Sequence, residues 1–99
     1  MLSKIFSKIS NKNEQPLRRI KDHYLYFYSS YPFCIRVRVV MNKLGLDIET
    51  RNIHQGTEHY EALQNGGGGT MVPCLRIDRD GETRWLYEST DIIKYLQEI

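Results

Sequence analysis

The spacing of apolar and polar positions changes several times along the chain, and each pattern predicts one element. The run Tyr24–Tyr28 is aromatic and apolar without polar alternation, which is typical of a strand buried on both faces. A helix is predicted to begin at Pro32, because proline in the first turn removes no helical hydrogen bond. The apolar stripe of this helix, at a period of 3.6 residues, is Phe33, Val37, Val40, Met41 and Leu44, and Gly45 is its expected stop.

The middle of the chain changes period twice. Residues 46–51 alternate apolar and polar side chains, which predicts a half-buried strand. Residues 57–64 predict a short helix with Tyr60 and Leu63 facing inward. The glycine-rich stretch 65–69 predicts a flexible loop, and it is no phosphate-binding loop because no Gly-Lys-Ser/Thr follows.

The last third predicts a hairpin and a helix. Residues 72–77 and 83–87 form its strands around the turn Asp78–Gly81, which has Asp-Gly turn chemistry. Ser89 is the expected N-cap of a final helix. Its inner face carries Ile92, Ile93 and Leu96. The order is β-α-β-α-β-β-α, which predicts an α/β domain with a four-stranded mixed sheet and helices on both faces.

Composition and charge exclude several classes of protein. The chain has 99 residues, enough for one domain, and no apolar run approaches the length of a membrane span. Two cysteines are too few for a disulfide-rich secreted scaffold, so a reducing cytoplasm is expected. Residues 1–21 hold six basic groups and one acidic group, whereas residues 22–99 hold eight basic and eleven acidic groups. A mildly acidic folded part argues against nucleic-acid binding.

The composition shift divides the chain into a basic extension, residues 1–22, and a domain, residues 23–99. A short apolar stripe between lysines in residues 1–12 is compatible with contact to an anionic membrane surface. A mitochondrial-type presequence is a further alternative. A frayed or self-packing extension is the favoured interpretation.

Three segments between about residues 24 and 98 resemble the glutaredoxin family and its glutathione-transferase relatives. Tyr-Pro-Phe-Cys at 31–34 looks like the family's Cys-Pro-Phe/Tyr-Cys motif, with Tyr31 in place of the first cysteine. Thr-Met-Val-Pro at 70–73 resembles the segment that carries a cis-proline. Tyr-Glu-Ser-Thr-Asp-Ile-Ile at 87–93 resembles the Glu-Ser helix start of glutathione-transferase N-terminal domains. The resemblance implies a thioredoxin-like fold in its glutaredoxin form.

The resemblance assigns roles to the residues around the first helix. Cys34 is the remaining thiol and would carry any redox step, unless it is only a small buried hydrophobe. The hydroxyl of Tyr31 would bond the sulfur of glutathione, with Ser30 as a rival donor, unless Tyr31 merely packs over the loop. Pro32 and Phe33 complete this part of the expected site. Cys74 is expected in the core, although its position after Pro73 leaves contact with Cys34 open.

The remaining expected contacts hold the rest of the glutathione molecule. A cis bond at Val72–Pro73 would turn the backbone of Val72 toward an extended peptide, whereas the alternative is an ordinary edge proline. Ser89 would bind the γ-glutamyl carboxylate at a helix start, and Glu88 would bind the ammonium group. No metal site is expected, because the three histidines lack ligand spacing with the cysteines.

The sequence therefore predicts a glutathione-linked thiol–disulfide oxidoreductase of glutaredoxin type, with glutathione as co-substrate. Its partners would be glutathionylated or disulfide-bearing proteins. The alternative is a glutathione- or protein-binding module that has lost its nucleophile. A glutathione transferase is the third hypothesis, disfavoured because transferases normally add a helical second domain.

Overall fold

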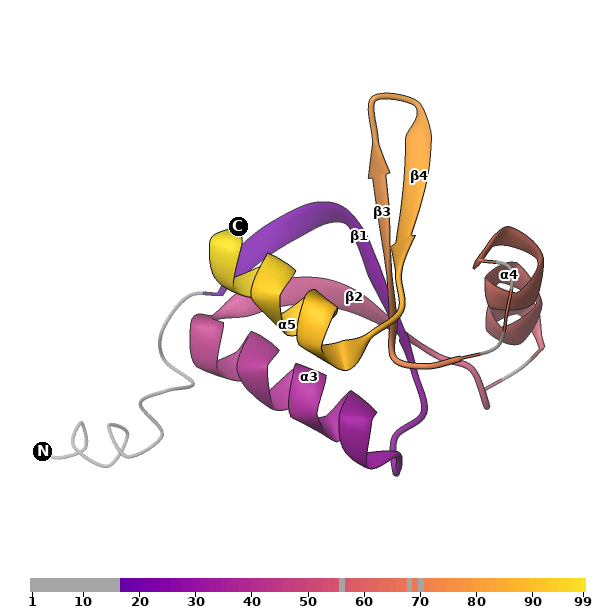
Figure 1. The fold of residues 1–99 in the computed structure, drawn as a ribbon, viewed down its shortest axis with the longest axis horizontal. Helices are drawn as coiled ribbons and strands as arrows, with labels where there is room; N and C mark the ends of the chain where they lie inside the picture. Colours follow the sequence, from indigo (N-terminus) through magenta and orange to yellow (C-terminus); the bar gives the residue numbers. More distant parts are fainter. Residues whose placement is uncertain (1–16, 56, 68, 70) are drawn as a thin grey trace, which may run out of the picture.

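A computed structural model describes residues 17–55, 57–67, 69 and 71–99. The predicted order β-α-β-α-β-β-α is confirmed within this part of the chain (Figure 1). Its elements are β1 (Arg18–Phe27), α3 (Pro32–Leu44), β2 (Leu46–Asn52), α4 (Glu58–Gly67), β3 (Cys74–Arg79), β4 (Glu82–Leu86) and α5 (Ser89–Glu98). The stripe expected within residues 1–12 lies outside the described residues.

The four strands form one mixed sheet in the order β2-β1-β3-β4. β1 pairs in parallel with β2 and antiparallel with β3, and β3 pairs antiparallel with β4. β1 therefore has a neighbouring strand on each side. Its alternate side chains enter two different cores, with Leu25 in one and Tyr26 in the other. The continuous apolar run of this strand arises because both of its faces are covered.

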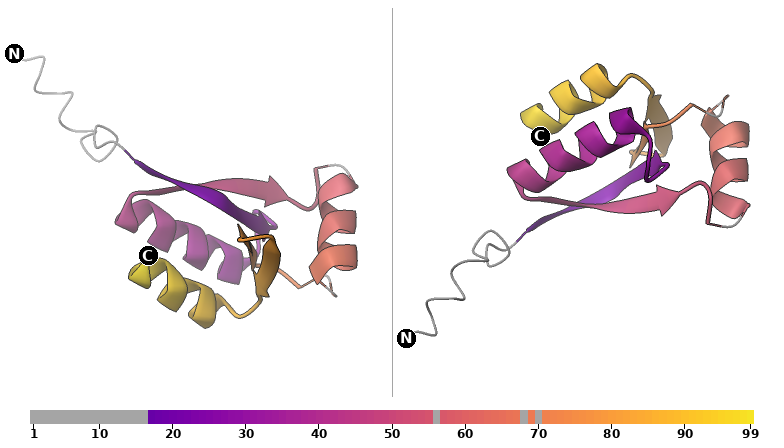
Figure 2. Two further views of the ribbon diagram at one scale, coloured as in Figure 1. Left: turned by 90° about the horizontal axis from the view of Figure 1, so that it is seen from above. Right: turned by 90° about the horizontal axis from the view of Figure 1, so that it is seen from below.

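Helices α3 and α5 lie side by side on one face of the sheet (Figure 2). Between them and the strands lies the larger core. Its buried members are Leu25, Phe27, Cys34, Val37, Met41, Leu46, Ile48, Leu75, Ile77, Ile92 and Leu96. Helix α4 lies apart from this pair, beyond the ends of β1 and β2 (Figures 1 and 2). Its Leu63 joins Tyr26, Ile53 and Cys74 in a second core on the opposite face.

The side chains that α3 buries differ from the predicted stripe. Cys34, Val37 and Met41 form its core face, whereas Phe33 and Leu44 are exposed. The helix begins at Pro32, so Cys34 lies in its first turn, on the face that meets the sheet. The inward assignment of Tyr60 on α4 was also wrong, because its side chain is 40% exposed.

Several boundaries differ from the predicted ones, and the β3–β4 turn is shorter than predicted, because β3 runs to Arg79 and β4 begins at Glu82. α4 continues through Gly67, so the loop expected at 65–69 is partly helical. β3 begins at Cys74 rather than at Val72. β1 begins at Arg18, upstream of the expected domain start at residue 23. The first residues of β1 are polar, so their pattern does not indicate a strand. A bulge also interrupts the register of β1 with β2, and Asp22 within it has a φ of 64°.

The expected capping role of Ser89 is wrong. Glu88 occupies the N-cap position of α5, with extended backbone and no side-chain capping bond, and Ser89 is the first helical residue. The backbone N–H of Ile92 donates to the Glu88 carbonyl at 2.9 Å, which sets this start. The amides of the first turn of α5 therefore have no capping side chain.

Candidate functional site

The predicted site residues come together at one edge of the sheet. The parallel strands β1 and β2 end there, and β3 begins there because Cys74 pairs with Tyr26 in antiparallel register. β4 ends at the same edge, since Leu86 pairs with Leu75. Helices α3 and α5 both begin near it (Figure 1). Ligands of α/β sheets commonly bind beyond the carboxyl ends of parallel strands, so this edge is the candidate site.

A tight turn leads from β1 into α3. The Tyr31 N–H donates to the Tyr28 carbonyl at 3.2 Å, and the Cys34 N–H donates to the Tyr31 carbonyl at 3.0 Å. Tyr31 is the N-cap with extended backbone, and no side chain caps the helix. Pro32 has no N–H to offer. Among the described residues, the Phe33 amide finds no acceptor, so it remains as a donor at the positive end of the helix.

The rim of this turn is aromatic and open to solvent. The side chains of Tyr31 and Phe33 are 41% and 48% exposed, and their ring centroids lie 5.4 Å apart. Ser30 is exposed in the same turn. The turn thus carries two exposed residues with hydroxyl groups, Ser30 and Tyr31, at the start of the helix.

Cys34 lies beneath this turn with no exposed surface. Burial raises the pKa of its thiol, although the Tyr28 N–H bonded to its sulfur and the charge of Arg38 both lower that pKa. The Tyr28 N–H donates to Sγ at 3.5 Å. Because burial is the largest cause, Cys34 is a thiol at neutral pH.

The two cysteines do not meet. Cys34 belongs to the core beneath α3 and α5, whereas Cys74 belongs to the core beside α4, and both thiols are free. Burial raises the pKa of Cys74 to about 12. The expectation that Cys74 serves in the core is confirmed by its complete burial.

The Val72–Pro73 bond is cis, as the motif predicted. Val72 is half-buried and contacts both cores, and Pro73 is buried directly before β3. Across β3 and β4, Glu88 is exposed and Ser89 half-buried at the start of α5. Every predicted site residue thus lies at this edge.

Two contacts at the edge were not predicted. The ring of Tyr28 packs at a tilt against that of His54, with centroids 4.0 Å apart. The guanidinium of Arg38 lies 4.5 Å from the centre of the Phe27 ring, on the strand that leads into the turn. The sequence predicts no partner for His54, and the aromatic run 24–28 is the one signal that could have suggested an aromatic contact.

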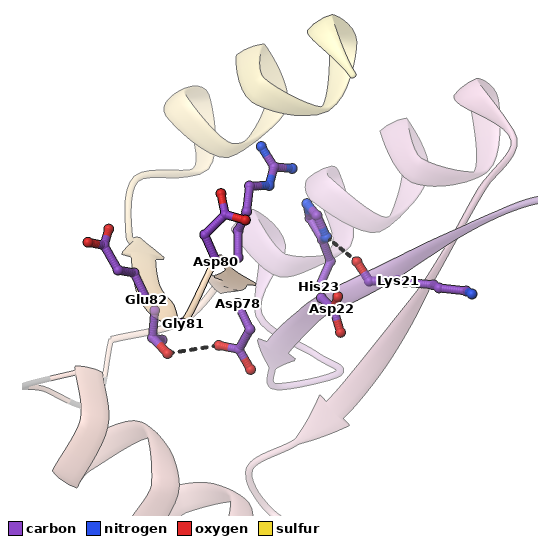
Figure 3. Close-up of a pocket in the computed structure, with 9 residues that line it drawn as sticks. Lys21, Asp22, His23, Asp78, Asp80, Gly81 and Glu82 are labelled. Carbon is purple, nitrogen blue, oxygen red and sulfur yellow. Dashed lines mark hydrogen bonds between the residues drawn. The ribbon is translucent and has the colours of Figure 1, made fainter.

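A hollow of about 610 Å³ lies elsewhere, between the early part of β1 and the β3–β4 hairpin (Figure 3). Charged side chains line it, among them Asp22, Asp80 and Glu82. His23 beside it is buried, and its two ring nitrogens lie 2.7 Å from the Lys21 carbonyl and from the Tyr95 hydroxyl. The turn of the hairpin lies at the opposite end of β3 from the candidate site, so this hollow is separate from that site.

In the described part of the chain, no three His, Cys, Asp or Glu side chains gather in a possible metal site. None of the helices described here is long and apolar enough to cross a membrane.

Comparison with known proteins places this geometry in a family. A model of the glutathione S-transferase N-terminal domain matches residues 25–99. A comparison with curated protein sequences finds no match.

Solved structures include similar domains. A maleylacetoacetate isomerase from Anaeromyxobacter dehalogenans, with dicarboxyethyl glutathione and citrate in its active site, is 29% identical with a TM-score of 0.59. The match covers 77% of this chain and 35% of that one. The same isomerase with glutathione bound gives 27% identity, a TM-score of 0.59 and coverage of 77% and 36%. A trimeric glutathione transferase from Leishmania shares the fold at 24% identity, with a TM-score of 0.63 and coverage of 77% and 17%. The chain thus spans about a third of the length of the isomerases, and by its family match it belongs to the glutathione S-transferase N-terminal domains.

Proposed function

We propose that this domain binds glutathione along the edge between α3, β3 and α5. The isomerase at 27% identity holds glutathione in its active site, which supports the same ligand here. The γ-glutamyl carboxylate would meet the uncapped amides at the start of α5, with Ser89 beside it and Glu88 taking the ammonium group. The peptide would pair with the backbone of Val72, and its thiol would reach the start of α3.

The proposed chemistry is activation of the glutathione thiol by the protein. The hydroxyl of Tyr31 would donate to the sulfur, and the Phe33 amide and the helix N-terminus would favour its negative charge. Ser30 remains the rival hydroxyl donor. The single observation that carries this proposal is the exposure of Tyr31 at the helix start above a fully buried Cys34. Glutathione would then supply the nucleophile, as in a transferase.

The second candidate is thiol–disulfide exchange at Cys34, with glutathionylated or disulfide-bearing proteins as partners. The Tyr28 N–H at its sulfur and the nearby charge of Arg38 both stabilise a thiolate, which favours this chemistry. It requires the turn over Cys34 to open, because the thiol has no exposed surface. The cytoplasm, where both thiols stay reduced, is the expected compartment.

The deciding experiment measures glutathione binding by calorimetry and the pKa of the bound thiol from its ultraviolet thiolate absorbance. In Tyr31→Phe, we expect glutathione to bind while its thiol pKa rises and its reaction with an aromatic electrophile slows by about tenfold or more. Cys34→Ser serves as the matched variant and is expected to keep the wild-type thiol pKa.

Each alternative has its own result. Loss of deglutathionylating activity in Cys34→Ser, with none lost in Tyr31→Phe, would favour the oxidoreductase. Binding without any change in the thiol pKa of glutathione would indicate a binding module. Absence of binding to the wild-type protein would refute glutathione as the ligand.

A further inference from the structure

The backbone of Tyr28 holds the turn that forms the candidate site. Its carbonyl accepts the Tyr31 N–H at 3.2 Å, and its own N–H donates to Sγ of Cys34 at 3.5 Å. One residue therefore contacts both the exposed hydroxyl-bearing residue and the buried thiol. A movement of the Tyr28 backbone would therefore disturb the hydrogen bonds of both Tyr31 and Cys34.

Within the described part of the chain, the aromatic neighbour of the Tyr28 side chain is the ring of His54. The ring centroids lie 4.0 Å apart at an interplanar angle of 37°. Tyr28 is 37% exposed and His54 is exposed as well, so core packing does not fix either ring. The tilted contact with His54 is thus an aromatic contact of the Tyr28 ring that lies outside both cores.

Hydrogen bonds hold the backbone segment that carries His54. Its N–H donates to Oδ1 of Asn52 at 2.8 Å, and the Gln55 N–H donates to the Asn52 carbonyl at 3.2 Å. The neighbouring Ile53 N–H donates to the Phe27 carbonyl at 3.0 Å, which ties this segment to the end of β1. These hydrogen bonds hold the backbone that carries the His54 imidazole, and they do not involve the turn 28–31.

We propose that His54 is a positioning residue whose aromatic contact with Tyr28 holds the turn 28–31 closed over Cys34. The proposal rests on the proposed function only in that this turn presents Ser30 and Tyr31 to glutathione. An aromatic pair of this kind biases the open–closed equilibrium of the turn by about threefold to tenfold. Loss of this contact would raise the fraction of molecules with an open turn, and so with an accessible Cys34, by that factor.

The test follows alkylation of the two cysteines in the glutathione-free protein, peptide by peptide, by mass spectrometry. In His54→Ala, we expect Cys34 to label about threefold to tenfold faster while Cys74 labels at the wild-type rate. His54→Phe keeps an aromatic face and is expected to label like the wild-type protein. His59→Ala is the matched control, because His59 contacts Tyr26 beside the other core, and it should leave Cys34 unchanged.

An unchanged Cys34 rate in His54→Ala would overturn the proposal, and so would an equal rise at both cysteines or an equal rise at Cys34 in His59→Ala. A His54→Phe variant that labels like His54→Ala would also overturn it, because the aromatic contact would then not be the cause. Calorimetry on the same proteins keeps the two proposals apart: a wild-type protein without glutathione affinity fails the proposed function, whereas the labelling ratios still decide the role of His54.

Discussion

Cys34 and Cys74 have no exposed surface, yet they lie on opposite faces of one sheet. Cys34 has a backbone donor and Arg38 nearby to offset the effect of burial on its pKa. Cys74 has only burial acting on its pKa. Burial therefore raises the pKa of both thiols, and only at Cys34 do a nearby donor and a nearby charge oppose that rise.

The high pKa of Cys74 predicts a loss of stability at alkaline pH. Unfolded Cys74 ionises near its ordinary pKa of 9.0, whereas the folded thiol keeps its proton up to about 12. Between these values the unfolded chain binds fewer protons, so the free energy of unfolding falls as pH rises, by at most about 1.4 kcal/mol per pH unit. Below about pH 9 the contribution is complete.

Urea denaturation of the wild-type protein and of Cys74→Ala at a series of pH values measures this contribution. The wild-type free energy should fall more steeply above pH 9 than that of Cys74→Ala. Equal slopes would mean that the thiol ionises alike in both states.

At the scale of elements, the end of α4 is shaped by the aromatic side chains that follow β3. A Cβ atom on Gly66 would lie 2.8 Å from the Trp85 ring, and one on Gly67 would lie 2.7 Å from the Tyr87 hydroxyl. At Gly69 a Cβ atom would meet nothing within 4 Å. Gly66 and Gly67 therefore allow the helix to pack closely on the strand. From the glycine-rich sequence alone, such a packing role cannot be distinguished from a flexible loop.

Gly67→Ala is therefore expected to destabilise the domain, and Gly69→Ala is its matched control. Overpacking against Tyr87 costs about 1–3 kcal/mol, which exceeds the gain of up to about 1 kcal/mol from the better helix propensity of alanine. Chemical denaturation of both variants provides the measurement. A Gly67→Ala variant as stable as Gly69→Ala would show that α4 does not pack closely there.

A network of arginines and aromatic rings crosses the same face of the sheet. Nη1 of Arg51 donates to the Tyr26 hydroxyl at 2.8 Å, and its guanidinium lies 4.1 Å from the centre of the Tyr24 ring. Arg51 and Arg76 each also pair with a carboxylate two residues away on their own strand. These arginines thus combine contacts to aromatic rings with ion pairs on the same strands.

For the whole molecule, the early part of β1 connects to two distant parts of the chain. The Arg18 N–H donates to the Gly45 carbonyl at 2.8 Å, and its Nη2 donates to the Ile99 carbonyl at 2.9 Å. Arg19 pairs with Asp47 at 3.2 Å. Residues assigned by composition to an extension thus belong to the sheet.

A chain of residues 23–99 is therefore expected to be less stable than a chain of residues 17–99, by about 2–3 kcal/mol. The loss follows from two hydrogen bonds at about 1 kcal/mol each and a smaller share from the exposed ion pair. Thermal and urea denaturation of the two truncated proteins would measure it. Equal stability would place the domain boundary where composition predicted it, at residue 23.

The sequence by itself determined the order of elements, the mixed sheet and the segments that make the candidate site. Periodicity and turn residues are local signals, and the runs at Tyr24–Tyr28 and Pro32–Leu44 carry them strongly. The tertiary structure alone decided that Cys34 rather than Phe33 enters the core, that Cys74 faces away from it, and that His54 meets Tyr28. These outcomes depend on which face of the sheet a side chain enters and on contacts between distant segments, and neither is encoded in the spacing of neighbouring residues.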